Sequence, residues 1–166
     1  MSSQTFDAER FKRDSRSSWD AAAAGWEKWW PLFERAAQKV SNRLVELAGI
    51  EPGDRVLDIA TGTGEPAITA ARAVGPNGRV IGVDHSPGML AVARRRASAL
   101  GLTNVEYREG DAASLGEPAG SFDAVLCRWG QCSCRICKPR LAASAMRSNL
   151  ERRSLPPCGT GLTRYR

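Results

Sequence analysis

A pair of glycines between an apolar run and an alanine-rich segment is the feature that most restricts how this chain can fold. Val56–Ile59 is short and apolar, as expected of a buried strand. Gly62 and Gly64 interrupt this run, and Pro66 stands near the first turn of a helix, where its missing N–H costs little. A strand, a glycine turn and a helix in this order form the nucleotide-binding corner of a doubly wound α/β fold. The stretch therefore predicts a Rossmann-like α/β protein.

The spacing of small residues predicts a nucleotide-containing ligand. Gly62-x-Gly64-x-x-Ala67 fits the G-x-G-x-x-G/A fingerprint. In that pattern Gly62 allows a tight turn, Gly64 lets a ligand approach the backbone, and Ala67 lets the helix pack close to the strand. Asp84 ends a second apolar run, Arg79–Asp84, about 20 residues after Gly64, where an acid meets ribose hydroxyls.

Two more strands are expected after a helix that begins near Ser86 and ends near Gly101. The segment 105–112 is a short strand that ends in an acid, Asp111, and Phe122–Cys127 is an apolar strand. The sequence therefore predicts four strands with intervening helices. Within the helix, the run 94–96 consists of three arginines and is expected to face solvent.

Several short motifs occur in one order: Asp58 to Gly64; Val83-Asp84 with Ser86, Gly88, Met89 and Leu90; Gly110-Asp111-Ala112; and Phe122-Asp123. On these motifs, the chain from Asp54 to Gly130 resembles a class I S-adenosylmethionine-dependent methyltransferase. It is most similar to the group that includes the ubiquinone/menaquinone-biosynthesis methyltransferases. The resemblance implies strand order 3-2-1-4, S-adenosylmethionine as cofactor, and methyl transfer to a small-molecule acceptor.

The resemblance also implies roles for individual residues. Asp111 would hold the adenine amino group, Ala112 would lie against the ring with Met89 near it, and Asp58 would face the ammonium end of the donor. Asp84 is expected to accept from both ribose hydroxyls, and the N–H groups of the loop are expected to hold the carboxylate. The predicted cofactor-binding residues are Asp58, Ala60, Thr61, Gly62, Thr63, Gly64, Asp84, His85, Met89, Gly110, Asp111, Ala112 and Arg128. No metal site is predicted, and no general base can be named.

Other interpretations stay open at this point. The glycine pattern with Asp84 also allows NAD(P), although Asp58 and the Gly110-Asp111 pair favour the methyl donor. Asp84 could be an ordinary strand-end residue, and Asp111 could be a turn former. His85, the only histidine, could edge the donor site or lie on the surface.

Two amphipathic helices are expected before the first strand. Ser17 or Ser18 could cap the first, Pro31 would interrupt it, and Gly49 would end the second. Apolar residues spaced by three and four form a stripe that includes Trp19, Trp26, Trp29 and Trp30. Core packing explains this stripe. A lid over the donor, as in the families that the chain resembles, is the functional alternative, and both can hold for different tryptophans.

Residues 131–166 differ in composition from the rest of the chain. They hold eight of the 24 Lys/Arg, one of the 18 Asp/Glu and four of the five cysteines, so the net charge of +6 arises there. A nucleic-acid interaction would rest on this segment alone and is disfavoured. Cys132-x-Cys134-x-x-Cys137 lacks a second well-spaced pair or a nearby histidine, which disfavours zinc.

The family pattern stops near residue 130. A helix and further strands are expected there and are not recognisable, which would leave strand four as an open apolar edge. Synonymous codons permit a shifted reading frame from codon 131 that encodes a family-like segment, so our hypothesis is an out-of-frame translation of residues 131–166. The coding DNA tests it, because stops or a non-sheet-like sequence in the shifted frame would contradict it. A truncated, non-catalytic remnant that retains only donor binding, or an enzyme completed by a partner chain, are the resulting alternatives.

Length and composition suggest one folding unit. The 166 residues divide into a frayed N-terminus (1–16), a helical lid (17–50), a donor-binding core (51–130) and the basic tail (131–166). No run of about 18 apolar residues occurs, so no membrane span is expected. The N-terminus has no signal pattern, and a cytoplasmic protein without a defined protein partner is expected.

Overall fold

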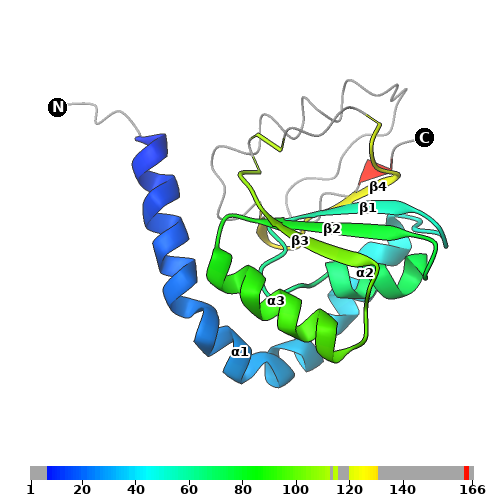
Figure 1. Cartoon of the computed structure of the whole chain (residues 1–166), viewed down its shortest axis with the longest axis horizontal. Helices are drawn as coiled ribbons and strands as arrows, with labels where there is room; N and C mark the ends of the chain where they lie inside the picture. The colour runs from blue at the N-terminus through cyan, green and yellow to red at the C-terminus, as the bar shows by residue number, and fades with distance from the viewer. Residues whose placement is uncertain (1–6, 113, 116–119, 131–162, 165–166) are drawn as a thin grey trace.

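The computed structural model describes residues 7–112, 114–115, 120–130 and 163–164. Its strands form one sheet in the order β3-β2-β1-β4-β5, with helices packed against it (Figure 1). The elements are α1 (Ala8–Leu47), β1 (Arg55–Ile59), α2 (Ala67–Val74), β2 (Arg79–Asp84), α3 (Pro87–Ala99), β3 (Val105–Glu109), β4 (Ala124–Leu126) and β5 (Thr163–Arg164). The fold is therefore α/β and Rossmann-like, as predicted.

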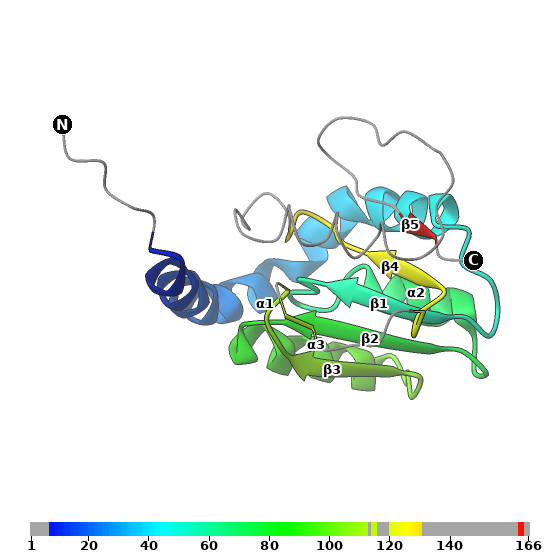
Figure 2. The ribbon, with the colours of Figure 1, turned by 90° about the horizontal axis from the view of Figure 1, so that it is seen from above.

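The first four strands are parallel and lie in the predicted order 3-2-1-4 (Figure 2). Leu57 of β1 is in register with Ile81 of β2 on one side and with Val125 of β4 on the other. Their carboxyl ends meet at one edge, where ligands bind in open α/β sheets. This arrangement brings the glycine loop after β1 next to Asp84 at the end of β2.

The outer side of β4 is not open. Thr163 and Arg164 pair antiparallel with Val125 and Ala124, and so form a fifth strand at that position. The expectation of an unpaired edge is therefore wrong over these residues, because a later segment of the chain supplies the missing backbone partners. The frameshift hypothesis concerns residues that lie outside the described part, apart from β5, and stays a prediction.

Helices α2 and α3 cover one face of the sheet (Figures 1 and 2). Their buried side chains, such as Ile68, Val74 and Leu90, are fully shielded from solvent together with Val56 and Val80 of the strands. Alanine-rich α2 can approach the sheet closely because its side chains are small, as the fingerprint predicts. The opposite face packs against the segment that leads from β3 to β4, with Phe122 buried there.

The N-terminal region is one helix of 40 residues, α1, and not two helices behind a frayed end. It begins after Asp7, whose carboxylate accepts a hydrogen bond from the Arg10 N–H at 2.9 Å and caps it. The predictions for Ser17 and Ser18 as caps, and for residues 8–16 as frayed, are therefore wrong. Pro31 lies inside the helix, and the ribbon bends midway along its length (Figure 1).

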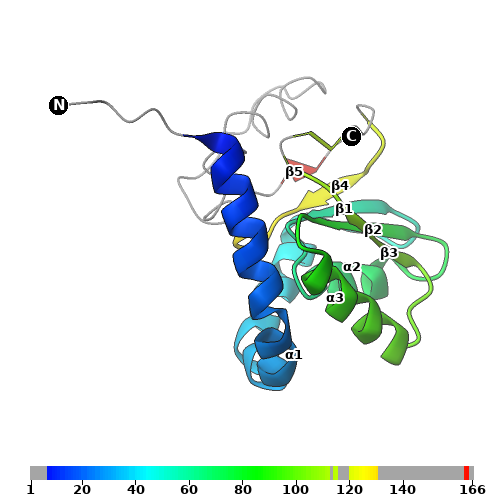
Figure 3. The same cartoon turned by 60° about the vertical axis from the view of Figure 1, so that its left-hand side comes forward.

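Helix α1 follows the edge of the domain and reaches over the carboxyl ends of the strands with its N-terminal half (Figure 3). Its C-terminal half packs on the core, where Leu44 and Val45 are buried. Within the described ranges, no helix is long and apolar enough to cross a membrane.

Candidate donor-binding site

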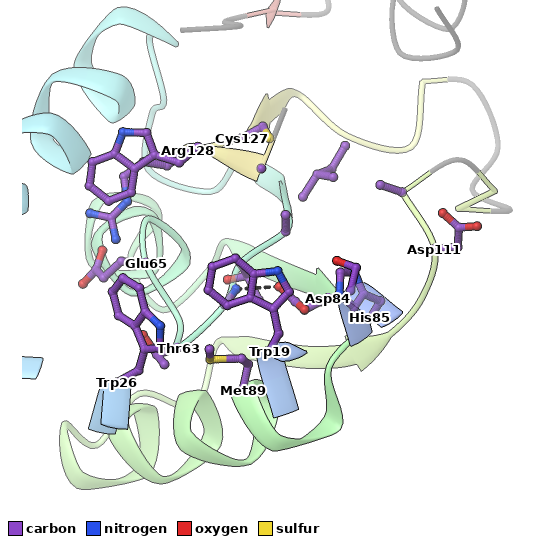
Figure 4. Close-up of a pocket in the computed structure, with 18 of the residues that line it drawn as sticks. Trp19, Trp26, Thr63, Glu65, Asp84, His85, Met89, Asp111, Cys127 and Arg128 are labelled. Carbon is purple, nitrogen blue, oxygen red and sulfur yellow. Dashed lines mark hydrogen bonds between the residues drawn. The ribbon is translucent and has the colours of Figure 1, made fainter. Parts of the chain in front are cut away.

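A cavity of about 210 Å³ lies at the carboxyl ends of β1 and β2, and residues of α1 contribute to its lining. Figure 4 shows lining residues such as Trp19, Asp84 and Arg128. Ten of the thirteen predicted site residues line it: Ala60, Thr61, Gly62, Thr63, Asp84, His85, Met89, Asp111, Ala112 and Arg128. Asp58, Gly64 and Gly110 do not. The structure therefore gathers most of the predicted set around one space.

The glycine loop has the backbone that its sequence requires. Gly62 and Gly64 have φ angles of 56° and 104°, which lie in the left-handed region. A Cβ on Gly64 would stand 2.9 Å from the Tyr107 hydroxyl, so this glycine serves close packing against β3. Gly62 is instead open on that side, toward the cavity that it lines.

Asp84 fixes this loop from the end of β2. One of its oxygens accepts from the Gly62 N–H and the other from the Ser86 N–H, both at 2.9 Å. The side chain is 8% exposed and borders the cavity. A carboxylate has about four acceptor positions, so Asp84 retains capacity for a ligand hydroxyl after these two bonds.

The loop N–H groups are less available than the sequence suggested. The Gly62 N–H donates to Asp84, and the Gly64 N–H donates to the Thr61 carbonyl at 2.9 Å. Both groups are engaged inside the protein, and binding of a ligand carboxylate by the loop and the helix start stays a prediction. These bonds preorganise the loop instead.

Asp58 and Gly110 have structural positions. Asp58 is completely buried, and one of its oxygens accepts from the Ala67 N–H at 3.1 Å at the start of α2. Burial raises the pKa of Asp58 to about 7, although the Thr61 hydroxyl acts in the opposite direction. Gly110 lies so close to β2 that a Cβ would stand 2.8 Å from Val83. Neither residue borders the cavity.

The lining of the cavity also includes Asp111, Ala112, His85 and Met89 of α3, which is 3% exposed. The Lys12 ammonium lies 2.8 Å from the Asp111 carboxylate, and this hydrogen bond raises the pKa of Lys12. The Nε2 atom of His85 is buried without a hydrogen-bond partner among the described residues. His85 therefore lies at the border of the cavity. The sequence had left open this position and a position on the surface.

Helix α1 supplies lining residues that the sequence motifs do not include: Phe11, Lys12, Ser15, Trp19, Trp26 and Trp30. The tryptophan stripe was the sequence signal that could have predicted these residues. Its side chains both pack in the protein and line the cavity: Trp26 lines the cavity, and its ring centroid lies 4.6 Å from that of Phe33. Trp29 is 53% exposed and does not line the cavity. Trp19, Trp26 and Trp30 thus border the cavity, and the lid over a donor stays a prediction.

Polar side chains attach the same helix to the ends of the strands. Lys12 pairs with Asp111, Arg16 pairs with Glu109 at 2.7 Å, and Asp20 accepts a hydrogen bond from Ser86. These three α1 residues are spaced by four, so they occupy one stripe of the helix surface. The N-terminal half of α1 is thus held along the cavity by two ion pairs and one hydrogen bond.

The arginine run in α3 does not simply face solvent. Arg94 donates to the Tyr107 carbonyl at 2.7 Å, and Arg95 makes a two-bond ion pair with Glu27 of α1. The Arg96 side chain is only 15% exposed and donates to the Thr63 carbonyl. The prediction of a solvated face is wrong for Arg96, because α1 folds over this part of α3.

Other lining residues carried no signal in the sequence. Glu65 is 4% exposed beside the loop, and Cys127, Trp129 and Gly130 follow β4. A Cβ on Gly130 would clash with the Ala60 side chain, so the segments that follow β4 and β1 lie in close contact. This contact depends on the pairing of β4 with β1.

A parallel sheet in this order, a glycine turn after β1 and an acid at the end of β2 define a nucleotide-binding protein of the Rossmann-like class. The pattern of the methyltransferase-domain family matches residues 56–151. The chain belongs to this family, and within it to the class I S-adenosylmethionine-dependent methyltransferases.

Curated relatives agree with this membership. A demethylmenaquinone methyltransferase of Thermus thermophilus is 46% identical over 89 residues, which cover 54% of this chain and 40% of the relative. An aklanonic acid methyltransferase of a Streptomyces species is 42% identical over 87 residues, which cover 52% of this chain and 40% of the relative. The matched segment thus spans about two fifths of these relatives.

Solved structures give the same fold. An arsenic(III) S-adenosylmethionine methyltransferase of Chlamydomonas reinhardtii is 34% identical, with a TM-score of 0.52 over 58% of this chain and 35% of that one. A phosphoethanolamine N-methyltransferase of Haemonchus contortus, in complex with phosphoethanolamine and S-adenosylhomocysteine, has a TM-score of 0.59. The match covers 77% of this chain and 27% of that one. At 21% identity, this second structure bears on the fold alone.

Proposed function

We propose that this chain binds S-adenosylmethionine in the cavity at the glycine loop and transfers its methyl group to a small-molecule acceptor. The main support for this proposal is the Asp84 carboxylate, which two backbone N–H groups hold at the cavity wall beside Gly62. That position suits a pair of ribose hydroxyls, since a carboxylate can accept from both. Family membership favours S-adenosylmethionine over NAD(P) as the ligand.

The remaining walls suit the other parts of this donor. Met89, Ala112 and Trp19 offer apolar surface in the lining of the cavity, which also includes Asp111. Asp111 is the candidate for the adenine amino group, and Lys12 restrains its carboxylate from α1. The residues present therefore fit the donor by chemical type: acids for hydroxyl and amino groups, and apolar side chains for a ring.

When bound, S-adenosylmethionine supplies an electrophilic methyl group that an acceptor atom attacks in line. The work of the chain is to align the two molecules and to exclude water, and positioning of this kind carries much of the catalysis. Trp26, Trp30 and Trp129 border the cavity and favour an acceptor with apolar surface. No residue is assigned here as a base.

Calorimetric titration of the full chain with S-adenosylmethionine and S-adenosylhomocysteine tests the donor site. Asp84→Asn should weaken binding about 10- to 100-fold, because a hydrogen bond to a charged group contributes about 1.5–3 kcal/mol. Asp123→Asn is the matched control. Asp123 also accepts a backbone N–H, that of Arg55 at 2.8 Å, but at the opposite end of β1 and outside the cavity lining.

Methyl incorporation from labelled donor separates an enzyme from a remnant that only binds. Binding together with transfer to candidate acceptors supports the proposal as stated. Binding without transfer to any acceptor supports the non-catalytic alternative. Wild-type chain that binds neither donor nor product would contradict the proposal.

A further inference from the structure

Arg96 of α3 joins three segments that the sequence keeps far apart. Its guanidinium donates to the Thr63 carbonyl of the glycine loop. The same group lies over the Trp30 ring of α1, with 3.2 Å from its central carbon to the ring centroid. The side chain is 15% exposed, so these contacts form largely out of water.

Two carboxylates surround the same guanidinium. Glu34 of α1 lies 3.5 Å from Arg96, and Glu65, next to the loop, lies 4.0 Å away with its side chain 2% exposed. Burial lowers the pKa of Arg96 to about 10, so the group remains cationic at neutral pH. Burial, together with the nearby Glu65 charge, raises the pKa of Glu34.

A planar guanidinium suits this position. A guanidinium can donate a hydrogen bond in its own plane to a carbonyl while its face stacks on an aromatic ring. A lysine ammonium cannot do both. The Thr63 carbonyl belongs to the residue between the two glycines, and Thr63 itself lines the cavity. A contact at this carbonyl therefore restrains the part of the backbone that faces the ligand.

The contact also links the loop to α1. Trp30 and Glu34 stand on either side of Pro31, where α1 bends, and Trp30 borders the cavity. A second connection runs from Gln38 of α1 to the Thr69 hydroxyl at 2.9 Å, and from that hydroxyl to Glu65 at 2.6 Å. The part of α1 around Pro31 is therefore connected to the glycine loop through side chains of α2 and α3.

We propose that Arg96 is a positioning residue: it holds the glycine loop in its donor-binding conformation and makes that conformation depend on the docking of α1. The inference rests on the proposed donor site for its effect on affinity. The proposed effect of Arg96 on the conformation of the loop concerns the protein without ligand, so it does not depend on the proposed donor site. Arg96 does not line the cavity, so it acts through Thr63 and not on the donor.

The adjacent Arg95 provides a matched control. Arg95 also joins α3 to α1, through bonds of 2.9 and 2.7 Å to Glu27, yet it is exposed and does not reach the loop. Arg96→Met and Arg95→Met each remove one α3–α1 ion pair. Only the first removes the restraint on the Thr63 carbonyl.

Two measurements on the full chain test the proposal: amide hydrogen exchange of residues 61–65 without ligand, and calorimetric titration with S-adenosylhomocysteine. Arg96→Met should speed exchange in this loop at least 10-fold and weaken binding at least 10-fold. Arg95→Met should change each less than 2-fold. Arg96→Lys and Glu34→Gln should have intermediate effects on loop exchange and on binding. These two variants test the proposal if Arg96→Met does not fold.

Equal effects of the Arg95 and Arg96 variants would overturn the proposal, since Arg96 would then only join two helices. Unchanged loop exchange in Arg96→Lys and Glu34→Gln would overturn it as well. If the wild-type chain does not bind S-adenosylhomocysteine, the proposed function fails, whereas the exchange comparison still decides the role of Arg96.

Discussion

Asp20 and Ser86 are joined by a hydrogen bond of 2.5 Å across 66 positions of sequence. Asp20 lies on α1, and Ser86 caps α3 by accepting from the Met89 N–H. The same Asp20 oxygen accepts from the Gly88 N–H at 2.9 Å, and a Cβ on Gly88 would stand 3.0 Å from it. Helix α1 is therefore anchored at the N-terminus of α3, beside the donor cavity.

We expect Asp20→Ala to lower the free energy of unfolding by about 1 kcal/mol, as for the loss of a helix cap. Asp20→Asn keeps an acceptor oxygen and should cost less. The hydrogen bond from Ser86 lowers the pKa of Asp20, so this stabilisation is present above the unfolded pKa and is lost as pH falls. Urea unfolding of the three proteins measures both effects. Equal stability of Asp20→Ala and wild type would contradict the anchor.

Asp58 should make the stability of the chain depend on pH in the opposite sense. Its folded pKa of about 7 lies above the ordinary value of 3.8, so the native state holds a proton that the unfolded chain releases. Stability contributed by this group therefore falls as pH rises from about 4 to about 7. Asp58→Asn should remove that dependence while keeping an acceptor for Ala67. Parallel pH profiles for both proteins in urea unfolding would show the assignment to be wrong.

Three glycines should respond differently to alanine. At Gly64 the φ of 104° and the contacts of the added Cβ with Tyr107 and Ala93 should together cost at least about 2 kcal/mol. Gly62 has a positive φ but open space, so only about 1 kcal/mol is expected. Gly25 lies inside α1 with nothing within 4 Å, and alanine should stabilise the protein by about 0.5–1 kcal/mol. Thermal and urea unfolding give the order, and a Gly62 variant less stable than the Gly64 variant would contradict it.

Tryptophan fluorescence should report ligand binding in the cavity. Four of the five tryptophans border it, and Trp29 does not. S-adenosylhomocysteine should shift the emission by displacing water from these rings. Trp19→Phe should reduce the amplitude of the change, whereas Trp29→Phe should leave it intact although Trp29 is 53% exposed. A change that disappears only in Trp29→Phe would indicate binding elsewhere.

Local patterns were enough to predict the centre of the fold. The apolar runs, the glycine turn and the acid after β2 are short-range signals, because strand, turn and helix preferences act within a few residues. They predicted the strands and the glycine loop, whereas the strand order and several of the ten residues found around the cavity were implied by the family resemblance. Asp84 is the clearest case, since its spacing from Gly64 follows from the length of one helix and one strand.

Long-range packing decided the rest. Pro31 reads as a helix end from local rules, yet α1 continues through it because residues on both sides pack on the domain. Arg96 reads as one of three solvated arginines until Trp30 and Glu34 of α1 cover it. Asp58 is completely buried and gives one oxygen to the start of α2, which its local sequence did not indicate. The sequence by itself determined the donor loop and its acid, since their chemistry is local. The tertiary structure alone decided which distant side chains enclose and restrain that loop, since burial and pairing depend on every segment that packs there.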